Sequence, residues 1–187
     1  MELIHFEKVR DGKYLKNYEL TYLNKAGREK KYEIVSHSEI RDVTEVGQRV
    51  SGVSIVVTMG EKLLLLKEFR MGVNRTIYNL CAGMIEAGET IEDCVRRELY
   101  EETGLELKEI VDVLPPSFAA VGLSDVKNQV VLAKVCEPER ETESHTSDNE
   151  EIRAAFYTRD EAARLVRSAE FSSRAQIITY FFSRGML

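Results

Sequence analysis

The sequence predicts an α+β fold in which helices cover a sheet. Short apolar segments of strand length recur along the chain, and three longer segments carry helical signals. The two kinds of segment do not alternate as regular βαβ units, which favours α+β layers over a doubly wound parallel sheet. With 187 residues, of which 43% are hydrophobic, the chain is long enough to bury one compact core.

The N-terminal segment is expected to form a small antiparallel sheet. Its strands are predicted at Met1–Val9, Tyr18–Leu23 and Lys31–Val35, with turn signals at Asp11-Gly12 and Lys25–Gly27. We therefore expect a strand-rich segment over residues 1–42 and a main domain over residues 43–187. Because so short a segment cannot bury an independent core, we expect it to contribute to a dimer interface.

The main domain is expected to hold further strands and three helices. A glycine-containing loop, Ala82–Glu89, precedes the first helix, and a polar loop is expected at Glu137–Asn149. The predicted strands are Ser51–Thr58, Lys62–Phe69, Thr76–Cys81, Leu107–Leu114, Val126–Cys136 and Ile152–Thr158. The two C-terminal helices are predicted at Asp160–Arg167 and Phe171–Arg184.

The first helix has clear start and stop signals. Thr90 with Asp93 fits the capping pattern S/T-x-x-D/E, and Gly104 stands where a C-terminal cap glycine belongs. The helix is also acidic at its C-terminal end, which the helix dipole disfavours. This local cost indicates that something other than helix stability fixes those residues.

The acidic residues of this helix share a face with its apolar stripe. At about 100° per residue, Val95 falls at about 40° and Leu99 at about 80° from the first helical residue. Glu98 falls at about −20°, Glu102 at about 20° and Glu101 beside them at about −80°. Carboxylates facing a core repel one another unless a cation compensates, and oxygen ligands suit Mg²⁺ or Mn²⁺. The pattern alone leaves open a solvated acidic helix end.

The composition and charge of the chain indicate which partners and which cellular compartment to expect. The net charge of −6 argues against nonspecific binding to nucleic acid. No apolar run approaches the ~20 residues that span a bilayer, and the N-terminus lacks the pattern of a signal peptide. Three widely spaced cysteines, Cys81, Cys94 and Cys136, match neither a zinc site nor a disulfide framework. We therefore expect a cytoplasmic protein with no membrane or nucleic-acid partner.

The stretch from Gly83 to Leu105 reads GMIEAGETIEDCVRRELYEETGL. It resembles the signature of the Nudix hydrolases: Gly, five residues, Glu, seven residues, then Arg-Glu-aliphatic-any-Glu-Glu-any-Gly-aliphatic. Every fixed position matches, at Gly83, Glu89, Arg97, Glu98, Leu99, Glu101, Glu102, Gly104 and Leu105. The resemblance implies an α/β/α sandwich whose mixed sheet carries a loop-helix-loop catalytic motif. It also implies Mg²⁺-dependent hydrolysis of a nucleoside diphosphate linked to another moiety.

The resemblance further implies roles for individual residues. Glu98 and Glu102 would be ligands of Mg²⁺ or Mn²⁺, with the carbonyl of Ala82 as a third. Glu101 would be a ligand or a base. Arg97 and Glu89 would brace the helix.

The segments LLLLKEFR and LCAGMIEAGE resemble the branch that hydrolyses ADP-ribose and related nucleotide sugars. By that resemblance Arg70 would face the phosphates, Glu86 would be an outer metal contact, and Gly83 would border the substrate. The strand-rich N-terminus resembles the segment that builds a homodimer in that branch. The products would be a nucleoside monophosphate and a sugar phosphate.

Two positions depart from the pattern of that branch. Val121 stands where a proline is usual, and Val126 where a loop glutamate is usual, with Asp125 adjacent. The general base therefore stays open among Glu101, Asp125 and the pair Glu150-Glu151. Two alternative functions also stay open: a nucleoside triphosphate pyrophosphohydrolase, and a non-catalytic module that senses nucleotide sugars.

Overall fold

The fold is described from a computed structural model, which covers residues 1–137, 144–145 and 151–187. The chain divides into two compact units. One comprises Met1–Gly52 and Pro115–Gln129, and the other comprises Val53–Leu114 and Val130–Leu187. The N-terminal strands therefore share a unit with residues 115–129, a segment that the sequence patterns do not connect with them.

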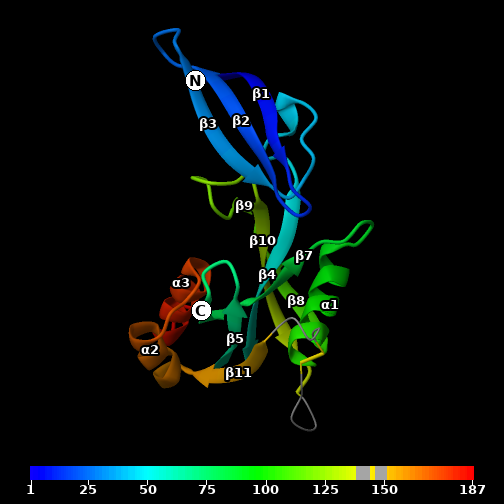
Figure 1. Ribbon diagram of the computed structural model, residues 1–187. Coiled ribbons are helices and arrows are strands. Elements are labelled where there is room, and N and C mark those ends of the chain that lie inside the picture. The colour runs from blue at the N-terminus through cyan, green and yellow to red at the C-terminus, as the bar shows by residue number, and fades with distance from the viewer. Residues whose placement is uncertain (138–143, 146–150) are drawn as a thin grey trace. The chain divides into compact units, whose positions relative to one another are not determined.

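The first unit is built on a three-stranded antiparallel sheet in the order β1-β2-β3 (Figure 1). The strands are β1 (Glu2–Asp11), β2 (Lys16–Leu23) and β3 (Glu29–Ser36). Alternation along β2 directs Tyr18 and Leu20 to one face, where they pack with Ile34 and Ile40. The 3-10 helix η1 (Val43–Glu45) and the short strand β9 (Ser117–Phe118) complete this unit. The expected N-terminal antiparallel sheet is confirmed.

The second unit is a sheet between two layers of helices. The five principal strands have the order β11-β5-β4-β10-β8, while β6 pairs with β5 and β7 with β4. Their bounds are β4 (Val50–Met59), β5 (Lys62–Arg70), β6 (Arg75–Asn79), β7 (Cys81–Met84), β8 (Leu107–Val113), β10 (Lys127–Val135) and β11 (Ile152–Thr158). Strand β9 of the first unit pairs with Lys127 and Asn128 of β10, which belong to that unit. The helices are α1 (Ile91–Thr103), α2 (Arg159–Ser168) and α3 (Ser173–Ser183).

The leucine run of β5 is buried on both of its faces. Leu64 and Leu66 belong to an apolar cluster that includes residues of α1, whereas Leu63 and Leu65 belong to a second cluster with residues of α2 and α3. Figure 1 shows α1 on one side of the sheet and the two C-terminal helices on the other. The expected α+β class, an α/β/α sandwich with an additional N-terminal sheet, is confirmed.

The loop predicted at Ala82–Glu89 begins too early. Residues 81–84 form β7, which pairs with β4, and the loop starts only after Met84. Gly83 makes the segment look like a loop, but it lies in a strand that approaches α1 closely. Of the loop expected at Glu137–Asn149, only residues 137, 144 and 145 lie in the described part. None of the helices in the described ranges is long and apolar enough to cross a membrane.

Candidate active site

Helix α1 begins and ends where its caps predict. The Thr90 hydroxyl accepts a hydrogen bond from Asp93 N, and the Asp93 carboxylate accepts one from Thr90 N, which completes a capping box. At the other end Gly104 adopts a left-handed conformation with φ of 67°, and its N–H donates to the carbonyl of Tyr100. These two ends fix the register of the acidic face relative to the sheet.

Two carboxylates of α1 lie on its buried face. Val95 and Leu99 are completely buried, and Glu98 and Glu102 on the same side are only 9% and 8% exposed. Glu101 points more toward solvent, with a side chain that is 46% exposed. The structure therefore places Glu98 and Glu102 on the buried face that periodicity predicts, whereas Glu101 lies at the border of that face with solvent.

Strand β7 lies directly against these carboxylates. The backbone N–H of Ala82 donates to Glu102 Oε2 at 3.1 Å. A side chain at position 83 would overlap the carboxyl group of Glu98, so glycine at this position lets that carboxyl group lie directly against the strand. Gly83 and Ala82 thus form one wall of the site through their backbone.

Burial perturbs the protonation of both buried carboxylates. The pKa of Glu102 is raised from 4.5 to about 8, with burial as the largest cause. The charges of Glu98 and Glu68 act in the same direction, and hydrogen bonds from Cys81 and Ala82 oppose them. The pKa of Glu98 is also raised, mainly by burial, although its hydrogen bond from Arg97 acts against the shift. Such a group calls for a nearby positive charge.

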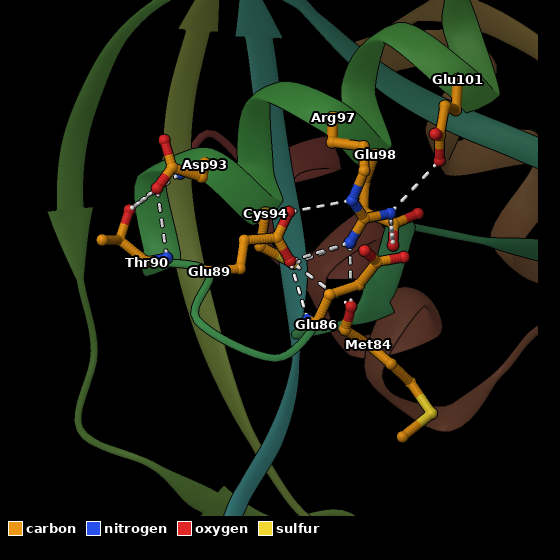
Figure 2. Close-up of polar contacts among 9 residues, drawn as sticks. All are labelled: Met84, Glu86, Glu89, Thr90, Asp93, Cys94, Arg97, Glu98 and Glu101. Carbon is orange, nitrogen blue, oxygen red and sulfur yellow. Dashed lines mark hydrogen bonds and ion pairs between the residues drawn. The ribbon is translucent and has the colours of Figure 1, made fainter.

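Arg97 connects the loop after β7 with the acidic face of α1 (Figure 2). Its guanidinium contacts Glu89 through two hydrogen bonds, at 2.9 and 3.0 Å, and reaches the carbonyl of Met84 at 2.9 Å. It also contacts Glu98 Oε1 at 2.7 Å and Glu101 Oε2 at 3.2 Å. The arginine hydrogen bonds hold the pKa of Glu89 at about 2, so Glu89 stays an anion.

Glu98, Glu101 and Glu102 line a cleft of about 660 Å³ in the second unit. Seven of the residues predicted for the site border it together: Arg70, Ala82, Gly83, Glu98, Glu101, Glu102 and the candidate base Glu151. Its other lining residues are Glu68, Phe69, Met71, Gly72, Met84, His145 and Ile152. Glu86 is not among the lining residues. Its side chain is exposed, and its backbone N–H donates to Glu89 Oε2 at 2.8 Å.

The sequence patterns missed Glu68, which is 4% exposed and faces the cleft. A signal was present in the period of β5. Glu68 falls two and four residues after Leu66 and Leu64, and therefore on the face of the sheet that packs against α1. His145 was also missed. Its ring stacks on Tyr100 with centroids 4.7 Å apart, and no spacing in the sequence indicates that contact.

The candidate bases lie in different parts of the chain. Glu101 and Glu151 both border the cleft. Asp125 belongs to the first unit, where its carboxylate accepts a hydrogen bond from Gly47 N at 3.3 Å. Glu150 lies outside the described residues.

The side chains around the cleft fit a hard divalent cation. Oxygen donors from Glu98 and Glu102 meet there beside a glycine backbone that leaves room for them, and the raised pKa of Glu102 marks a shortage of positive charge. Among the described residues, no three His, Cys, Asp or Glu side chains are already gathered as a ligand set. Arg97 contacts Glu98 Oε1 at 2.7 Å, so one oxygen of this carboxylate is already paired with a guanidinium.

Comparison with known proteins agrees with this geometry. A family model described as the NUDIX domain matches residues 48–180. An ADP-ribose pyrophosphatase from Bacillus subtilis (strain 168) is 30% identical over 167 residues, which cover 88% of this chain and 82% of that protein. An ADP-sugar pyrophosphatase from Mus musculus is 29% identical over 134 residues, covering 69% of this chain and 59% of that protein.

A solved structure described as an ADP compounds hydrolase has the same fold. It superposes with a TM-score of 0.71 at 21% identity, covering 98% of this chain and 91% of that chain. The fold and the acidic cleft define an enzyme of the pyrophosphohydrolase class. The family match over residues 48–180 shows which one: the chain belongs to the Nudix family. The expectation of a Nudix-type enzyme is thereby confirmed.

Proposed function

We propose that the enzyme hydrolyses the diphosphate linkage of ADP-ribose or a related nucleoside diphosphate sugar, with Mg²⁺ or Mn²⁺ as the cofactor. The observation that carries the proposal is the cleft itself, which is lined both by buried Glu98 and Glu102 and by Arg70. An anionic diphosphate is bound best by a divalent cation together with a basic side chain. In this cleft Glu98 and Glu102 can hold the cation, and Arg70 is the basic side chain. The names of the relatives support a nucleoside diphosphate sugar as substrate.

Each residue then has a definite task. Glu98, Glu102 and the Ala82 carbonyl would hold the cation, and Glu101 would be a further ligand. When bound, the cation would neutralise the diphosphate and activate a water for attack on phosphorus. Arg97 keeps Glu89 and the loop after β7 fixed against α1. Arg70, whose side chain is 59% exposed, can reach the phosphate oxygens.

For the general base we favour Glu151. Its residue lines the cleft, whereas the carboxylate of Glu101 already accepts a hydrogen bond from Arg97. A base must come within hydrogen-bond reach of the attacking water. Asp125 is not among the residues that line the cleft, so its role as a base stays a prediction. The amide variants of Glu101, Asp125 and Glu151 test the choice when turnover and Mn²⁺ affinity are measured separately. The base variant should lose turnover while keeping its metal affinity.

A substrate panel with Mg²⁺ tests the proposal. It should contain ADP-ribose, other nucleoside diphosphate sugars and the nucleoside triphosphates, with products identified by mass spectrometry. We expect AMP and ribose 5-phosphate from ADP-ribose. Turnover restricted to the triphosphates would instead favour the pyrophosphohydrolase alternative.

A further inference from the structure

Glu68 is a buried carboxylate whose two oxygens have different partners. Oε1 accepts a hydrogen bond from Asn79 Nδ2 at 2.6 Å, and Oε2 lies 3.5 Å from Arg70 Nη1. Its side chain is 6% exposed, and the Arg70 side chain is 59% exposed. One oxygen of this carboxylate is therefore bound inside the protein, and the other faces the exposed side chain of Arg70 at the cleft.

The inner end is held by a directional chain of hydrogen bonds. The Ser172 hydroxyl donates to Asn79 Oδ1 at 2.6 Å, which leaves the amide nitrogen of Asn79 to face Glu68. Ser172 is itself fixed, because it is the N-cap of α3 and its N–H donates to the carbonyl of Tyr78 at 3.0 Å. The Asn79 side chain therefore presents its NH₂ group to Glu68, and Glu68 Oε1 accepts this hydrogen bond.

The strand register places all three side chains on one face. Asn79 of β6 is paired with Leu66 of β5. Glu68 and Arg70 follow Leu66 at intervals of two residues, so they point to the same face, and Asn79 is the diagonal neighbour of Glu68. Asn79, Glu68 and Arg70 therefore follow one another along this face, and the last two line the cleft.

We propose that Glu68 is a positioning residue that orients the Arg70 guanidinium toward the substrate diphosphate. The inference rests on the proposed function, in which Arg70 contacts the phosphates. A free arginine loses rotamer freedom when it is immobilised. Anchoring by Glu68 removes part of that cost before the substrate binds, and the Ser172–Asn79 pair stops the anchor itself from turning away.

A double-mutant cycle of Glu68→Gln and Arg70→Ala tests this. We expect Glu68→Gln to raise KM about tenfold, the size of one charge-assisted hydrogen bond, with kcat within a few-fold of wild type. In the Arg70→Ala background the same change should have no further effect, because Glu68 acts through Arg70. Asn79→Leu should reproduce part of the Glu68→Gln effect. Arg75→Ala is the matched control, since Arg75 pairs with Arg70 across the strands and forms an exposed ion pair with Glu170.

Two further measurements separate the explanations. The affinity of each variant for α,β-methylene-ADP, a diphosphate that resists hydrolysis, should follow the same pattern as KM, and Mn²⁺ affinity should stay at the wild-type value. Additive effects in the cycle, a fall in Mn²⁺ affinity on Glu68→Gln, or a lower KM from reduced repulsion would each overturn the inference. The variants could show this pattern of analogue affinities while the wild type does not hydrolyse nucleotide sugars. In that case the proposed substrate fails and the positioning role of Glu68 stands.

Discussion

Glu102 is 8% exposed, and this burial is the main reason that its pKa is raised to about 8. The negative charges of Glu98 and Glu68 raise the pKa further. In the unfolded chain the same carboxyl has a pKa of about 4.5. Between these two values the folded protein binds a proton that the unfolded chain has released. The free energy of unfolding must therefore fall as the pH rises through this window. A divalent cation bound by the carboxylates would oppose that loss.

In EDTA, the melting temperature of the wild type should decrease from about pH 5 to about pH 8, and Glu102→Gln should flatten that decrease. Added Mn²⁺ should raise the melting temperature of the wild type more at the higher pH, where the carboxylate is ionised. Thermal denaturation across this pH range measures both effects. Parallel curves for the wild type and Glu102→Gln would show that the buried carboxyl does not govern the dependence.

Gly83→Ala should damage the site without unfolding the protein. The new Cβ would overlap the carboxyl group of Glu98, which is the end of a flexible side chain and can turn away. We expect Mn²⁺ affinity and kcat to fall about tenfold or more, within the range known for lost orientation of metal ligands, with little change in melting temperature. Gly122→Ala, where no atom lies within 4 Å of the new Cβ, is the control. Unchanged metal affinity in Gly83→Ala would contradict the assignment of Glu98.

Among the elements, α1 could be predicted almost completely from sequence. Thr90 and Gly104 are local cap signals, and the shared face of Val95, Glu98 and Glu102 follows from helical period alone. Strand β7 could not be predicted in this way, because Gly83 is a loop signal unless the close approach of α1 is known. Glu68 also depends on tertiary structure, since its contact with Asn79 arises from the pairing of β5 with β6.

Helix α3 carries a buried hydroxyl that costs stability. Thr179 is completely buried, and its Oγ1 has no hydrogen-bond partner among the described residues. Thr179→Val should raise the free energy of unfolding by about 1 kcal/mol, because it removes an unsatisfied polar group at nearly constant volume.

Thr103→Val is the matched comparison for this change. The Thr103 hydroxyl is also buried, but it donates to the Leu99 carbonyl at 2.5 Å and accepts from Leu105 N at 3.1 Å. This variant should lose about 1 to 2 kcal/mol. Chemical denaturation measures both variants. Equal destabilisation by the two would show that Thr179 has a partner in solution.

For the whole molecule, we expect a homodimer built through the N-terminal sheet. The first unit exposes apolar side chains that a monomer would leave in water, including Ile4, Val9, Tyr14 and Tyr32 at 41%, 55%, 71% and 41% exposure. Sedimentation equilibrium at micromolar concentration should give twice the chain mass. Val9→Lys with Tyr14→Lys should shift the equilibrium toward monomer. A wild-type monomer at this concentration would exclude the dimer.

Glu102→Gln tests the central claim most directly, because it removes one charge from the face on which the proposed chemistry depends. We predict that turnover of the best nucleoside diphosphate sugar falls by ~10²-fold or more at saturating Mg²⁺, with a folded protein by circular dichroism. Glu92→Gln, on the exposed side of the same helix where Glu92 pairs with Arg96, should keep wild-type turnover. A Glu102→Gln enzyme with near-normal turnover at saturating Mg²⁺ would contradict the account.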